Sequence, residues 1–139
     1  MGKVLHSDAD LKHLLENTRT IALVGASPKP NRPSHGVMAY LQRSGYRVIP
    51  VNPVVAGTQI LGETVYGTLA EIKEPIDMVD VFRRAEDTPP VAEEAVAAGA
   101  KSLWLQLDIA NDDAAKIATE GGLDVVMDRC TAIEVGRLL

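Results

Sequence analysis

Five short runs of apolar residues constrain the fold of this chain more than any other feature. The runs do not alternate between apolar and polar residues, a pattern typical of strands buried on both faces in a parallel sheet. The predicted strands are residues 20–24, 47–51, 77–82, 102–107 and 124–127. They predict an α/β fold: a Rossmann-like, doubly wound parallel sheet of about five strands with flanking helices, in a single domain.

Helical patterns occupy most of the intervals between these runs, and the first precedes them all, at residues 8–17. Each pattern begins near a Ser, Thr or Asn residue, whose side-chain oxygen can accept a hydrogen bond from a free N–H of the first turn. The predicted N-cap residues are Ser7, Ser34, Thr88, Asn111 and Thr131.

The strand order determines where such a sheet binds its ligand. Numbered along the chain, the strands are expected in the order 3-2-1-4-5, which reverses direction between the first and fourth strands. Ligands of doubly wound sheets bind at the carboxyl ends of the strands, at that reversal. The predicted site therefore draws on the loops at residues 25–36, from 52 onward, and at 82–88, 106–110 and 128–131.

The charge of the chain is unevenly distributed. The 139 residues carry a formal net charge of -5, which disfavours a general nucleic-acid binder, and a hydrophobic fraction of 46% excludes a disordered chain. Residues 17–62, however, contain no Asp or Glu and include several Lys and Arg residues. This basic stretch in an acidic protein favours a small phosphorylated ligand.

Other classes of protein are excluded by simpler features. Cys130 is the only cysteine and no Cys/His cluster has metal-ligand spacing, so we expect neither a disulfide framework nor a metal site. No apolar run approaches the roughly 20 residues of a membrane span, and the polar N-terminus does not resemble a signal peptide. We expect a cytoplasmic protein that binds neither membrane nor nucleic acid.

The loop after the first strand, residues 25–36, lies where a dinucleotide-binding fold places its phosphate turn. The small residues Gly25, Ala26 and Ser27 let the backbone approach a phosphate, and Lys29 and Arg32 add positive charge. The glycine spacing is not that of a nicotinamide-cofactor fingerprint. The second strand also ends in Asn52-Pro53, without the acid that holds the ribose of NAD, so NAD is disfavoured.

With these residues in view, the chain resembles the small stand-alone CoA-binding proteins, which are similar to the N-terminal domain of the succinyl-CoA synthetase α subunit. The resemblance covers the chain from about Leu11 to Leu138. Its carriers are Ile21-Ala22-Leu23-Val24-Gly25-Ala26-Ser27, Arg32 with Ser34 and Gly36, Val51-Asn52-Pro53, Val79-Asp80-Val81-Phe82-Arg83, Trp104-Leu105-Gln106-Leu107 and Met127-Asp128-Arg129-Cys130. It implies that residues 1–139 form one CoA-binding, Rossmann-like domain.

The resemblance also implies roles for individual residues. The backbone of residues 25–27 and the helix start at Ser34, His35 and Gly36 would receive the CoA phosphates, with Lys29 nearby and Arg32 paired to one of them. Asn52 and Pro53 would border the adenosine end, and Phe82 and Arg83 would line the side near the pantetheine arm. The synthetases carry a lysine just after the position of Pro53, where this chain has Val54, so one contact to the 3′-phosphate is expected to be absent.

Three residues permit two interpretations each. His35 could act as an acid or base, but we favour a helix-start histidine that faces solvent or phosphate. Cys130 could be a reactive thiolate near the end of a thiol cofactor, but we favour a buried, space-filling cysteine. Trp104 could stack on adenine, but we favour a core position.

The expected function is therefore the binding of coenzyme A or an acyl-CoA, without catalysis, as a carrier, a sensor or a module that meets a partner enzyme. We expect no catalytic residues, because the phospho-histidine domain of the synthetases does not follow Leu139. The protein is expected as a monomer or weak homodimer. The alternative is an NAD(P)- or other nucleotide-binding oxidoreductase or regulator.

Overall fold

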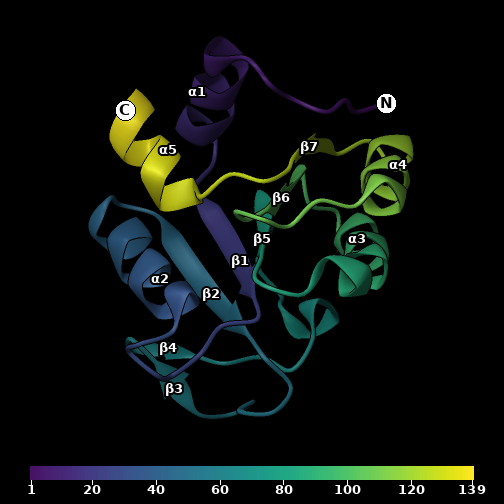
Figure 1. The fold of residues 1–139 in the computed structure, drawn as a ribbon. Coiled ribbons are helices and arrows are strands. Elements are labelled where there is room, and N and C mark those ends of the chain that lie inside the picture. Colours follow the sequence, from purple (N-terminus) through teal and green to yellow (C-terminus); the bar gives the residue numbers. More distant parts are fainter.

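Five parallel strands form the central sheet of the molecule (Figure 1). The computed structural model describes residues 1–139. The strands are β1 (Thr20–Val24), β2 (Arg47–Val51), β5 (Met78–Val81), β6 (Ser102–Leu105) and β7 (Asp124–Val126). All of the predicted strands are present: β1 and β2 have the predicted bounds, and the other three are shorter by one or two residues. The Rossmann-like single domain is confirmed.

The order of the strands differs from the prediction. The sheet runs β2-β1-β5-β6-β7, so the third predicted strand pairs with the first rather than with the second, and 3-2-1-4-5 was wrong. Pro50 lies within β2, and its carbonyl points away from β1 to accept a hydrogen bond from the N–H of Tyr66. Because proline has no N–H to donate on that side, β2 suits the edge of the sheet and not its centre.

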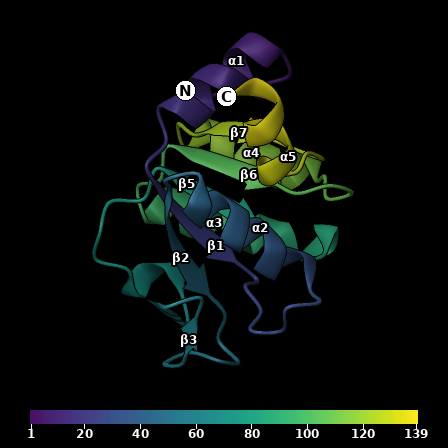
Figure 2. The same ribbon diagram turned by 90° about the vertical axis from the view of Figure 1, so that its left-hand side faces the viewer.

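Helices cover both faces of the sheet, as Figures 1 and 2 show. On one face lie α3 (Thr88–Ala97) and α4 (Asp112–Glu120); on the other lie α1 (Asp8–Glu16), α2 (Pro33–Arg43) and α5 (Thr131–Leu138). None of these helices has the length and apolar character needed to cross a bilayer.

Two apolar clusters fill the two spaces between sheet and helices. Successive strand residues alternate between them: Ala22 packs toward α3 and α4, whereas Ile21 and Leu23 pack toward α1, α2 and α5. Trp104 is fully buried in the second cluster, and its Nε1–H donates to the carbonyl of Arg129 at 2.7 Å. The core position favoured for Trp104 is confirmed.

The predicted helix caps hold at two sites. The side chains of Ser7 and Asn111 accept hydrogen bonds from the first turns of α1 and α4. The cap predictions at the other three sites were wrong, because Thr88 and Thr131 are the first residues of their helices and Ser34 is the second residue of α2. Those residues are Ser34, Thr88 and Thr131, and the capping positions belong to Arg32, Asp87 and Cys130 respectively. Pro33 explains the start of α2, since its fixed φ and missing N–H suit the first helical position.

The connection from β2 to β5 contains no long helix. It forms the two-stranded sheet of β3 (Gln59–Ile60) and β4 (Glu63–Thr64), followed by a short 3-10 helix, η1 (Leu69–Glu71). A second 3-10 turn, η2 (Ala85–Asp87), leads from β5 into α3.

Candidate functional site

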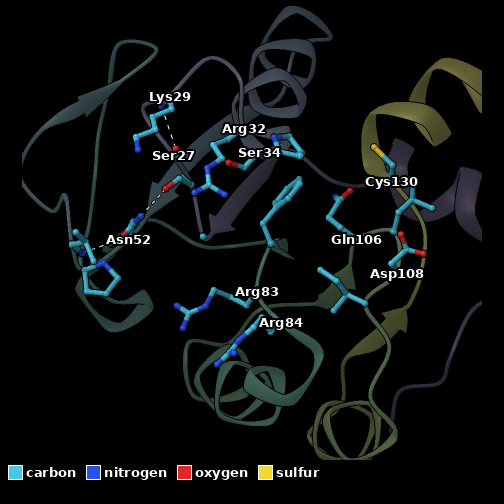
Figure 3. Close-up of a pocket in the computed structure, with 18 residues that line it drawn as sticks. Ser27, Lys29, Arg32, Ser34, Asn52, Arg83, Arg84, Gln106, Asp108 and Cys130 are labelled. Atoms are coloured by element: carbon cyan, nitrogen blue, oxygen red, sulfur yellow. Dashed lines mark hydrogen bonds between the residues drawn. The ribbon is translucent and has the colours of Figure 1, made fainter.

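One cavity of about 1030 Å³ opens at the carboxyl edge of the sheet (Figure 3). Most of the residues predicted for the site line it: Gly25, Ala26, Ser27, Lys29, Arg32, Ser34, Asn52, Pro53, Phe82 and Arg83. His35 and Gly36 follow in α2 and do not line it. The cavity is also lined by residues that were not among the predicted site residues: Pro33, Val54, Arg84, Gln106, Leu107, Asp108, Ile109 and Cys130.

Gly25 is required by the packing of the sheet as much as by any ligand. Its φ is +90°, and a Cβ placed there would lie 2.2 Å from the carbonyl oxygen of Phe82. Its N–H donates to the carbonyl of Val51 at 2.9 Å. The glycine therefore allows the turn after β1 to pass between the ends of β2 and β5.

Asn52 ties this turn to the end of β2. Its Nδ2 donates to the carbonyl of Ala26 at 2.8 Å, and its Oδ1 accepts from the N–H of Val54 at 2.9 Å. The side chain thus fixes two loops of the cavity wall, and its carboxamide oxygen is already engaged. It does not resemble the carboxylate that a ribose of NAD requires.

Positive charge gathers around the cavity. Lys29 and Arg32 lie on the loop before α2, and Arg83 and Arg84 follow β5. Arg84 pairs with Glu86 and Asp87 of η2, while the other three cations form no ion pair. The first residues of α2 also face the cavity, where the partial positive charge of a helix N-terminus adds to the field. This arrangement can bind an anion.

The opposite end of the cavity has different chemistry. Gln106, Asp108 and Cys130 lie there, at the far side from Asn52 in Figure 3. Asp108 has a φ of +65°, and its N–H donates to Oδ1 of Asp128 at 2.7 Å. It is the only acidic residue among those that line the cavity. This end is therefore the less positive one.

Behind Gln106 lies a buried carboxyl group. Asp80 of β5 is fully buried and accepts hydrogen bonds from Gln106 and from Thr131 of α5. Burial raises the pKa of Asp80 from 3.8 to about 7, although the hydrogen bonds from Gln106, Thr131 and the N–H of Val81 lower it. The prediction from sequence gave Asp80 no role. The signal was present, however, because a single acid interrupts an otherwise apolar strand.

Cys130 is partly exposed and lines the cavity, at the residue before α5 begins. The favoured interpretation of a buried, space-filling cysteine was wrong. The reason is that the loop after β7, which was predicted at the carboxyl edge, turns this side chain toward the cavity and not into the packed interior.

Comparison with known proteins shows which families and structures this chain resembles. The family model described as "CoA binding domain" matches residues 19–136. The chain is 41% identical over 127 residues to the YneT protein of Bacillus subtilis, covering 91% of this chain and 93% of that protein.

Two further similarities extend the comparison. The acetate–CoA ligase (ADP-forming) I subunit alpha of Pyrococcus furiosus is 33% identical over 91 residues, or 63% of this chain, but the match spans only 20% of that subunit. A solved structure from Thermus thermophilus superposes with a TM-score of 0.92 at 39% identity, covering 96% of this chain and all of that one.

Proposed function

This chain belongs to the CoA-binding domain family, and on that premise we propose that it binds coenzyme A or an acyl-CoA in the cavity at the carboxyl edge of the sheet. The match to the family model begins at Arg19, but α1 buries Leu11 and Leu15 in the core. We therefore extend the proposed ligand-binding domain to residues 1–139.

The observation that carries the proposal is the set of cations around the cavity. Lys29, Arg32 and Arg83 face it without acidic partners, next to the N-terminus of α2. A coenzyme A molecule carries a diphosphate and a 3′-phosphate, which need such partners. A cavity of about 1030 Å³ is also ample for a cofactor-sized ligand.

The proposed contacts follow from the positions of the residues. The backbone of Gly25, Ala26 and Ser27 and the start of α2 at Ser34 would receive the diphosphate, with Arg32 paired to it. Pro53, next to Asn52, would border the adenosine. Phe82, between Gly25 and Gln106 at the end of β5, would lie beside the pantetheine arm. His35 and Gly36 would support the helix start without direct contact, since neither lines the cavity.

The proposed biological role is that of a carrier, a sensor or a module that meets a partner enzyme in the cytoplasm. In this role, the function of the protein depends on whether the ligand is bound, and the protein acts as a monomer or weak homodimer. No observation favours the alternative of an NAD(P)-dependent protein, because the side chain of Asn52 already bonds to two loops where NAD would need a carboxylate.

Calorimetric titration with CoA, acetyl-CoA and NAD tests the proposal. CoA or acetyl-CoA should bind with one ligand per chain, and NAD should not displace it. The Arg32→Ala variant should bind CoA about 10- to 150-fold more weakly, since a charge-assisted hydrogen bond contributes about 1.5–3 kcal/mol and every 1.4 kcal/mol is a factor of ten. Absence of CoA and acetyl-CoA binding by the folded wild-type protein would overturn the proposed function.

A further inference from the structure

Three buried side chains from three separate segments of the chain form a closed set of hydrogen bonds beneath the cavity. Gln106, just after β6, donates from Nε2 to Oδ1 of Asp80 at 2.5 Å and to Oγ1 of Thr131 at 2.9 Å. Thr131 in turn donates from Oγ1 to Oδ2 of Asp80 at 2.9 Å. All three residues are at least 96% buried, since their exposed fractions are 4%, 0% and 0%.

The direction of each of these bonds is determined by the carboxylate. An ionised Asp80 can only accept, so it takes one hydrogen from Gln106 and the hydroxyl hydrogen from Thr131. The Thr131 oxygen then has only lone pairs left for Gln106. Turning the Gln106 amide over would place its carbonyl against the carboxylate, which is unfavourable in a buried site. Both hydrogens of Nε2 are therefore used inside the protein.

The other end of the Gln106 amide has no partner within the protein. No hydrogen bond reaches Oε1, yet no buried side-chain oxygen or nitrogen is left without a partner. Oε1 must therefore reach the accessible surface, and the surface that Gln106 lines is that of the cavity. Oε1 of Gln106 is therefore a neutral hydrogen-bond acceptor that is held in a fixed orientation and is accessible to a ligand.

The position of this acceptor limits which part of a ligand it can meet. Figure 3 places Gln106 away from Asn52 and Lys29, and therefore away from the end where the adenosine would lie. A phosphate has no N–H to donate and would be repelled by a carbonyl oxygen. The pantetheine arm of CoA, in contrast, contains amide N–H groups that need an acceptor once they leave water.

We propose that Oε1 of Gln106 accepts a hydrogen bond from an amide N–H of the pantetheine arm, and that Asp80 and Thr131 are positioning residues that hold the amide in this orientation. The proposal rests on the proposed function and adds to it the recognition of the arm. A thiol is a weaker donor than an amide, so the thiol end is the less suitable partner.

A pair of ligands tests it: CoA, and adenosine 3′,5′-bisphosphate, which carries phosphates and adenosine but no arm. Calorimetric titration at pH 8.5, where Asp80 is ionised, compares wild type with Gln106→Leu. The variant should lose about 3- to 10-fold in affinity for CoA, the range for one neutral hydrogen bond, and nothing for the bisphosphate. Gln59→Leu is the matched control, because Gln59 is exposed on β3 outside the cavity, and it should bind both ligands as wild type does.

Asp80→Asn tests the positioning role without changing the volume of the buried group. An asparagine no longer dictates which end of the Gln106 amide faces it, so affinity for CoA should fall by a few-fold while affinity for the bisphosphate stays unchanged. The same variant decides the question if Gln106→Leu fails to fold. The variants should lose as much affinity for desulfo-CoA, which lacks the thiol, as they lose for CoA.

The possible results separate the two proposals. Suppose that wild type binds CoA while both variants lose affinity for CoA and for the bisphosphate equally, or lose affinity for neither ligand. In either case the role of Gln106 is structural, and this inference is wrong while the proposed function stands. If the loss disappears with desulfo-CoA, the contact is to the thiol and the assignment to an amide is wrong. If folded wild type binds no CoA, the proposed function fails and this inference fails with it.

Discussion

Asp80 occupies an unusual place for an acid, at the centre of a parallel sheet with no accessible surface. Its only polar contacts are hydrogen bonds, and no ionised side chain contributes to its pKa. The charged residues at the start of α5 and on it bond elsewhere: Glu134 pairs with Arg129 and Arg137. The protonation of Asp80 should therefore be coupled directly to folding.

The stability of the protein should reflect this coupling. Because burial raises the pKa of Asp80 from 3.8 to about 7, its neutral form favours the folded state. The contribution is fully present below about pH 4 and is lost as the pH rises through about 7. Wild type should lose up to about 4 kcal/mol relative to Asp80→Asn between pH 4 and pH 8.5, measured by urea unfolding. Parallel pH profiles for the two proteins would contradict the prediction.

Cys130 provides a second measurement at the scale of one residue. Its thiol is partly exposed on the cavity wall, so iodoacetamide should alkylate it in the folded protein. Saturating CoA should slow the reaction, because the ligand would cover that wall. Mass spectrometry follows the modification, and an equal rate with and without CoA would place the ligand elsewhere.

At the scale of elements, α1 is the segment whose place in the domain is least evident from the family comparison, because the match begins after it. Leu11 and Leu15 are buried against the sheet. Arg137 of α5 also reaches back to both carboxylate oxygens of Asp8, at 2.9 and 2.8 Å. Helix α1 thus closes one end of the core beside α5.

This packing predicts a clear difference between two neighbouring residues of α1. Leu11→Ala should lower the free energy of unfolding by about 2–5 kcal/mol, the range for removing a buried leucine side chain. Lys12→Ala, at an exposed position in the same helix, should change it by less than about 0.5 kcal/mol. Thermal or urea unfolding measures both, and equal effects would mean that α1 is not part of the folded core.

At the scale of the whole molecule, a net charge of -5 coexists with a positively charged cavity. Lys29 and Arg32 come from the basic stretch of residues 17–62, whereas Arg83 and Arg84 come from the loop after β5. Only the fold brings these two groups to one site. The local field therefore has the opposite sign to the total charge.

Ligand affinity should follow the local field. Raising the salt concentration from about 0.05 to 0.5 M should weaken the binding of CoA, since the added ions screen the cations of the cavity. Arg83→Ala should both weaken binding and reduce this salt dependence, while Lys12→Ala, which removes a cation outside the cavity, should do neither. Titrations at several salt concentrations measure the effect, and an affinity independent of salt would argue against phosphate binding here.

The sequence alone determined which segments become strands, that both faces of the sheet are covered, and which loops lie at its carboxyl edge. These properties depend on patterns within a few residues. Because all strands of a parallel sheet end at the same edge, most of the loop from Gly25 to Ser34, together with Asn52 and Phe82, lines one cavity even though the predicted strand order was wrong. Pro50 could have placed β2 at the edge, since its missing N–H is a local property.

The tertiary structure alone decided how distant segments meet. The bonds from Asp80 to Gln106 and to Thr131 join residues 26 and 51 positions apart, and no local pattern specifies them. The same holds for the exposure of Cys130 on the cavity wall. Burial, hydrogen-bond direction and local charge depend on what packs against a residue, so they exist only once the strands have taken their order.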